Sequence, residues 1–107
     1  MNPEIAKNWG IALKALNAAK TAFENGESDY KIKKELRTSI FYGQYMTKDL
    51  GLGGEERLIA AGTAVERFNQ KFARFGTRDA IEETIKALKE YHNLVPPEYN
   101  LPVPIDC

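Results

Sequence analysis

The chain has 107 residues, with fifteen basic and fifteen acidic side chains and a formal net charge of zero. This length leaves room for one hydrophobic core and excludes a second domain. Hydrophobic residues make up 43% and charged residues 28% of the chain, which is typical of a globular protein and excludes a disordered one. Dedicated non-specific nucleic-acid-binding proteins usually carry an excess of basic residues, so the balanced charge favours protein partners.

The distribution of apolar residues and cysteine predicts where the protein acts. No segment approaches the ~20 uninterrupted apolar residues that a membrane-spanning helix needs. The N-terminus lacks the charged and apolar regions of a secretory signal. The only cysteine, Cys107, cannot form a disulfide within the chain. We therefore expect a cytoplasmic protein, in a cell or in an infected host, that does not bind membranes.

Apolar residues recur at spacings of three and four through most of the chain, which predicts an all-α fold. We expect four helices at about residues 3–25, 28–50, 54–75 and 78–93. The connections between them are short, which favours antiparallel neighbours and an up-down four-helix bundle. Residues 1–93 would then form one helical domain.

The first two helices have clear start and stop signals. Asn2 and Pro3 predict the start of the first helix as a capping side chain and a first-turn proline, and Gly26 predicts its end. Ser28 is the expected N-cap of the second helix. The second helix is apolar around much of its circumference, so it lies at the centre of the bundle or beneath a second chain.

The third helix has the most regular apolar pattern in the chain. Its apolar residues alternate spacings of three and four: Leu58, Ala61, Val65, Phe68, Phe72 and Phe75. Gly76 predicts the end of this helix, and Thr77 predicts the N-cap of the fourth. The fourth helix ends near Asn93, because Pro96 and Pro97 cannot continue it.

Residues 94–107 predict an extended, proline-rich C-terminal arm. Four apolar residues recur with period two, which in an extended chain places them on one face: Tyr99, Leu101, Val103 and Ile105. Pro102 and Pro104 fall between them, so one edge of the arm lacks N–H donors. Three outcomes stay open: docking on its own bundle, docking on a neighbouring subunit or different protein, and disorder.

The sequence contains no catalytic or metal-binding pattern. A di-iron site in a helical bundle needs Glu-x-x-His pairs, but the residue three before His92 is Lys89. A zinc site needs several cysteine or histidine ligands, and His92 and Cys107 are the only two such residues. Cys107 has no fixed base beside it to activate its thiol. We therefore expect no enzymatic activity, no cofactor and no bound metal.

Basic residues support an alternative function. Arg67, Lys71, Arg74 and Arg78 recur at helical spacing: the first three would form a basic flank on the third helix, and Arg78 lies just past its end. Basic residues of the second helix could complete a groove for an anion, a nucleotide or nucleic acid, with tyrosines available for stacking. The same charges also follow the order that helix dipoles favour, with acids near the helix starts and bases near the ends.

The function that we expect first is a non-enzymatic interaction protein. It would self-associate or belong to a larger assembly, as small helical accessory proteins of phages and bacteria do. The second helix and the arm would bind the partner, because tyrosine and methionine suit protein interfaces and the arm needs a surface to lie on. The expected partner-binding residues are Phe41, Tyr42, Tyr45, Met46, Tyr99, Leu101, Val103 and Ile105. The alternative is an anion-, nucleotide- or nucleic-acid-binding bundle that uses the basic flank.

Overall fold

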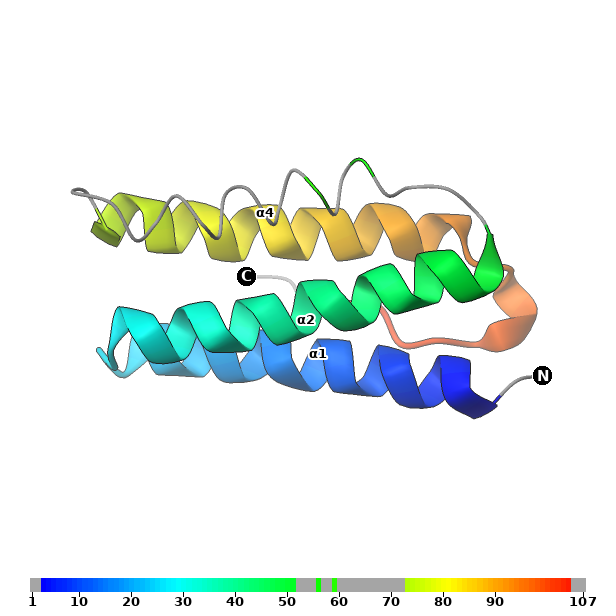
Figure 1. The fold of residues 1–107 in the computed structure, drawn as a ribbon, viewed down its shortest axis with the longest axis horizontal. Coiled ribbons are helices and arrows are strands. Elements are labelled where there is room, and N and C mark those ends of the chain that lie inside the picture. Colours follow the sequence, from blue (N-terminus) through cyan, green and yellow to red (C-terminus); the bar gives the residue numbers. More distant parts are fainter. Residues whose placement is uncertain (1–2, 52–55, 57–58, 60–72, 105–107) are drawn as a thin grey trace.

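The computed structural model describes residues 3–51, 56, 59 and 73–104, without the side chains of residues 73–76. Within these residues the fold is all-α, as predicted, and no strand occurs among them. The three long helices are α1 (Pro3–Glu24), α2 (Asp29–Leu50) and α4 (Ala73–Leu94), and the short 3-10 helix η1 (Pro97–Tyr99) follows them (Figure 1). Most of the predicted helix over residues 54–75 lies outside the described residues, so a four-helix bundle is not established.

Helix α1 and helix α2 form an antiparallel hairpin whose turn has the predicted capping residues. Gly26 has a φ of 69°, and the N–H groups of Gly26 and Glu27 donate to the carbonyl oxygens of Phe23 and Ala22 at 3.1 and 2.9 Å. This pair of bonds is a Schellman motif. The motif favours glycine at position 26 because the backbone there adopts the left-handed conformation. Ser28 then caps α2 by accepting a hydrogen bond from the N–H of Lys31 at 3.3 Å.

Small residues let the two helices of this hairpin approach closely. The α1 side of the contact is lined by buried alanines: Ala12, Ala15, Ala19 and Ala22. Ser39 of α2 is fully buried, and its hydroxyl donates to the carbonyl oxygen of Ala12 at 2.8 Å. Gly43, one turn further along, is also buried. The large core side chains, with Trp9, Leu36 and Leu88 at zero exposure, fill the space between the helices.

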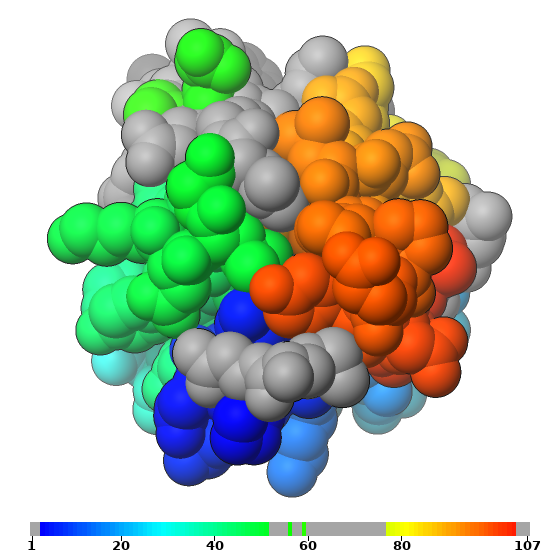
Figure 2. Space-filling view, turned by 90° about the vertical axis from the view of Figure 1, so that its right-hand side faces the viewer, coloured from blue at the N-terminus to red at the C-terminus, as the bar shows by residue number. Residues whose placement is uncertain are grey.

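Helix α4 packs against α2 and runs in the same direction as α2, antiparallel to α1 (Figure 1). The C-terminal ends of α2 and α4 therefore lie side by side at one end of the molecule, as the green and orange sectors of Figure 2 show. The end of α2 and the start of α4 are at opposite ends of the bundle. Contacts between α1 and α4 are sparser than those that either helix makes with α2.

The predicted helix boundary at Gly76 and Thr77 is wrong. Both residues lie inside α4, which begins at Ala73. A glycine within a helix costs only about 1 kcal/mol relative to alanine, so tertiary contacts can override it. Thr77 is 1% exposed, and its hydroxyl donates to a carboxylate oxygen of Asp29 at the start of α2 over 3.3 Å. Thr77 lies inside α4 beyond its first turn, so it cannot be the N-cap of that helix.

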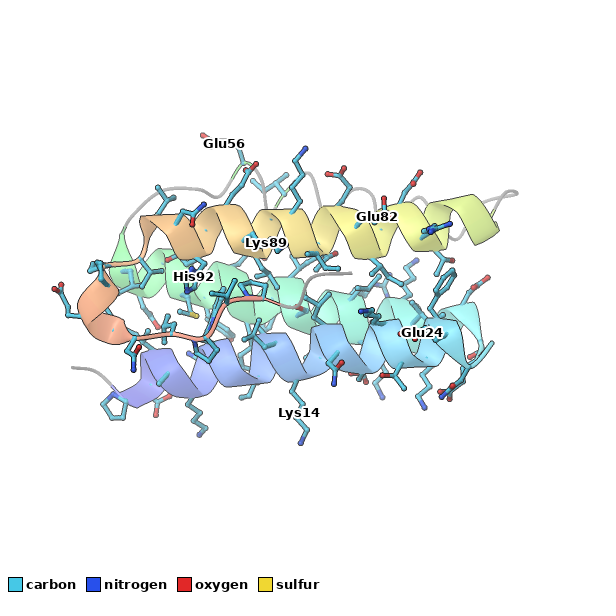
Figure 3. The ribbon with its side chains drawn as sticks, turned by 180° about the vertical axis from the view of Figure 1, so that it is seen from behind. Lys14, Glu24, Glu56, Glu82, Lys89 and His92 are labelled. Carbon is cyan, nitrogen blue, oxygen red and sulfur yellow. The ribbon has the colours of Figure 1, made fainter. Side chains whose placement is uncertain are left out.

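The C-terminal arm turns back instead of continuing straight. After α4 ends at Leu94, η1 and Asn100, whose φ is 50°, reverse the chain. The segment after η1 then runs between α1 and α4 on the side away from α2 (Figure 3). The described part of the arm therefore docks on its own bundle.

The period-two pattern of the arm does not place its apolar residues on one face. Tyr99 and Leu101 pack against the core, but Val103 is 65% exposed and Pro104 is buried. Beyond the turn at Asn100, Leu101 and Pro104 face the bundle and Val103 faces solvent, so the strict alternation expected of an extended segment is lost. Ile105 lies outside the described residues.

Candidate functional site

Three aromatic side chains form a cluster on the outer side of α2. The ring centroids of Phe41 and Tyr45 are 4.6 Å apart with an interplanar angle of 75°. Tyr42 lies 6.0 Å from Phe41 and 5.8 Å from Tyr45. Edge-to-face contacts of this kind are worth about 0.5–1.5 kcal/mol each, so the three rings hold one another in place.

This cluster faces solvent although it is strongly apolar. Phe41 is 52% exposed and Tyr45 is 44% exposed, while Tyr42 is half-buried. A phenylalanine exposed to this degree in the middle of a helix gains little from folding alone. Met46, which the sequence grouped with these residues, is fully buried in the core and takes no part in the surface.

Cationic side chains extend the aromatic cluster along the helix. Six exposed residues follow one another at spacings of three or four: Tyr30, Lys34, Arg37, Phe41, Tyr45 and Lys48. At about 100° per residue, all six lie within roughly 40° of the direction of Phe41. We call these six residues the aromatic–cationic face. None of them is acidic, so the face combines apolar rings with positive charge.

A hollow borders this face at the C-terminal end of α2. It has a volume of about 240 Å³ and is lined by Gln44, Thr47, Lys48 and Ile59. Ile59 is 56% exposed, which adds an apolar side chain to its wall. The hollow lies beside Lys48, at one end of the aromatic–cationic face.

Two side chains from different helices bind the arm. The indole N–H of Trp9 on α1 donates to the carbonyl oxygen of Pro102 at 2.6 Å. The Nε2 atom of His92 on α4 lies 2.8 Å from the carbonyl oxygen of Leu101. A carbonyl oxygen only accepts, so Nε2 carries the hydrogen in this contact. The rings of Trp9 and His92 are themselves 5.8 Å apart.

The prolines of the arm suit this docking. Each buried N–H group needs an acceptor, and an unpaired one costs about 1–3 kcal/mol. Pro102 and the buried Pro104 have no N–H to satisfy. The arm thus offers mainly carbonyl oxygens to the helices, and Trp9 and His92 supply the donors. The sequence did not predict that Trp9 and His92 bind the arm. Their acceptors are backbone carbonyl oxygens, which every residue has, so no residue pattern marks the contact.

The predicted basic flank falls largely outside the described residues. Arg67 and Lys71 are not described, and Arg74 is described only as part of the helical backbone of α4. Arg78 is exposed on α4, where its Nε atom lies 3.6 Å from a carboxylate oxygen of Glu82. Exposed pairs of this kind contribute about 0.2–1 kcal/mol. Arg78 is therefore the one predicted anion-binding side chain that the structure describes, and the basic flank stays a prediction.

The end of the α1–α4 groove beyond the arm is open. It holds a hollow of about 180 Å³ lined by Lys20, Phe23, Glu24, Arg78, Ile81 and Glu82. Glu24 and Glu82 lie at this end on facing helices (Figure 3). Two acids balance the two bases, so the hollow has no charge preference for an anion.

Among the described residues, one buried polar side chain lacks a hydrogen-bond partner. Tyr91 is 1% exposed, and its hydroxyl forms no hydrogen bond within this part of the chain. Burial, with a smaller contribution from the negative charge of Asp49, raises the pKa of Tyr91 to about 12. The Tyr91 ring packs among the buried residues of the core.

The described residues show neither a metal site nor a membrane-spanning helix. Within residues 3–51, 56, 59 and 73–104, no group of three or more His, Cys, Asp or Glu side chains is placed to hold a metal ion. In the same part of the chain no helix combines the length and apolarity needed to cross a membrane.

No protein-family model matches the chain, and neither a curated protein sequence nor a solved structure matches it significantly. Its function must therefore be argued from its own residues.

Proposed function

We propose that the protein is a non-enzymatic interaction module that binds a protein partner through the aromatic–cationic face of α2. The observation that carries this proposal is the exposure of Phe41 and Tyr45, at 52% and 44%, within an ordered aromatic cluster. Exposed aromatic rings on a rigid helix are typical anchors of protein interfaces. The proposal keeps α2 as the binding element and gives the described part of the arm a bracing role, since Tyr99 and Leu101 pack on the core.

The experiment compares two double variants of the purified protein. Phe41→Ser with Tyr45→Ser removes the aromatic anchors, whereas Lys7→Ser with Lys14→Ser changes exposed residues of α1. A photoreactive group at position 38 cross-links partners from the native source so that they can be identified. Each partner is then produced recombinantly, and its binding to the two variants is measured with purified proteins. We expect the α2 variant to lose the partner and the α1 variant to retain it. Equal binding by both variants would rule out the aromatic–cationic face.

The parallel direction of α2 and α4 supports a further part of this proposal. We propose that the segment joining them in the sequence forms a fourth helix. In an up-down bundle, two parallel helices are separated in sequence by an antiparallel one. A helix over residues 54–72 would be about 28 Å long, close to the length needed to return the chain along α2. Backbone chemical shifts of these residues test this directly, and values typical of coil would exclude the fourth helix.

A further inference from the structure

The charges of the aromatic–cationic face indicate which kind of protein partner it binds. This inference rests on the proposed function. We infer that the face binds an acidic amphipathic helix. The apolar side of that helix would cover Phe41 and Tyr45, and its carboxylates would lie over Lys34 and Lys48. The partner is thus a helical protein segment with apolar residues at spacings of three and four and glutamate or aspartate beside them.

The positions of the two lysines match this partner. Lys34 and Lys48 are each seven residues from Phe41, so one lies two helical turns before it and the other two turns after it. At 1.5 Å per residue, the two lysines are separated by about 21 Å along α2. A helix lying lengthwise on α2 therefore has its apolar centre on the rings and reaches a cation on either side. The hollow beside Lys48 receives an apolar side chain from the same helix.

A second copy of this chain is a poor occupant of the face. If two α2 helices pair antiparallel about Phe41, Lys34 of one copy meets Lys48 of the other. If they pair in parallel, each lysine meets its own equivalent. Both arrangements place like charges together, which disfavours the pairing. Carboxylates on a different protein remove this repulsion.

Single-stranded nucleic acid fits the face less well than a helix does. Stacking of successive bases needs ring faces that are open and similarly oriented. The rings here stand edge to face, at 87° for Phe41 with Tyr42 and 75° for Phe41 with Tyr45. The cluster therefore presents ring edges and an apolar ridge, which suit aliphatic side chains.

The test uses two fluorescent peptides of about 18 residues, long enough to form an amphipathic helix when bound. Both carry the same leucine stripe, with glutamate beside the stripe in one peptide and lysine in the other. We expect the intact protein to bind the glutamate peptide about tenfold more tightly at about 50 mM salt, and the preference to shrink at about 200 mM. Fluorescence anisotropy gives both affinities.

Charge reversal on the protein supplies the second arm of the test. Lys34→Glu with Lys48→Glu should reverse the preference, so that the lysine peptide binds more tightly. The matched control, Lys7→Glu with Lys14→Glu on α1, makes the same change in net charge away from the face; Lys14 points away from α4 and the arm (Figure 3). It should leave the preference for the glutamate peptide in place. Circular dichroism confirms that each variant is folded.

Three outcomes would overturn the inference. The first is equal binding of both peptides by the intact protein. The second is an equal loss of preference in both double variants, which would mean that only net charge matters. The third is binding of an oligothymidine, but of neither peptide, that depends on Lys34 and Lys48. A partner that needs Phe41 and Tyr45 but ignores charge reversal would leave the proposed function standing and reject the acidic helix alone.

Discussion

Trp9 on α1 and His92 on α4 donate hydrogen bonds to the carbonyl oxygens of Pro102 and Leu101, two consecutive residues of the arm, at 2.6 and 2.8 Å. Successive carbonyl groups of an extended chain point to opposite sides, so each helix reaches one of them. The arm thereby bridges two helices that make few direct contacts with each other. By joining α1 and α4, the arm contributes to the stability of the bundle.

Replacing His92 with alanine should weaken the arm contact. Loss of the hydrogen bond to Leu101 is expected to lower the free energy of unfolding by about 1 kcal/mol. Trp9 is the single tryptophan and is fully buried beside His92, so its emission should shift to longer wavelength. Urea unfolding followed by circular dichroism and fluorescence measures both effects. Asn93→Ala, an exposed neighbouring change, should produce neither.

Ending the chain after Leu94 should destabilise the bundle itself. The arm covers Trp9 and contributes Tyr99 and Leu101 to the core, so its removal exposes apolar surface at a cost of about 25 cal/mol per Å². We expect a lower melting temperature and a red-shifted Trp9 emission. An unchanged melting temperature with loss of partner binding would show instead that the arm acts in trans.

Replacing Tyr91 with phenylalanine should not destabilise the protein at neutral pH, because the buried hydroxyl has no hydrogen-bond partner. Its effect should appear in alkali. The folded-state pKa of about 12 lies above the ordinary value of 10.0 because burial disfavours the ionised form, so the folded state loses stability relative to the unfolded chain as the pH rises from 10 to 12. Tyr91→Phe should therefore reduce the loss of stability between pH 10 and 12. Tyr30→Phe, at a 77% exposed position, should leave it unchanged.

Ser39 should tolerate alanine better than leucine. Alanine removes the buried hydrogen bond to Ala12 and is expected to cost about 1 kcal/mol. Leucine adds volume where α1 and α2 approach closely, and overpacking of this kind typically costs about 1–3 kcal/mol more. Chemical unfolding of the two variants gives the order. Equal stabilities would mean that the hairpin contact is loose.

The caps of the hairpin were predictable because they depend on local sequence. Gly26 and Ser28 act through hydrogen bonds to residues only a few positions away, and both predictions are confirmed. Thr77 has the same local preference for a cap, but α4 begins before it, at Ala73, and its hydroxyl donates to Asp29, 48 residues distant in sequence. Such a contact depends on tertiary packing, which cannot be predicted from the capping preference of a single residue.

Only part of the candidate site could be predicted from local sequence. Aromatic residues at positions 41, 42 and 45 indicate an apolar surface on the second helix, but the sequence does not decide which arc of the helix faces the core. The structure turns Met46 inward and Phe41 outward. The cations Lys34 and Lys48 join the site only once that orientation is known.

The hydrogen bond between Trp9 and Pro102 joins residues 93 positions apart. Closing so long a loop is entropically costly, so this contact should form after the α1–α2 hairpin, whose partners are near in sequence. During synthesis the hairpin can fold while the segment that seals the α1–α4 groove is still being made. Until residues 99–104 are synthesised, the indole N–H of Trp9 lacks its acceptor on Pro102, so the nascent chain passes through a stage in which this side of the bundle is not yet covered.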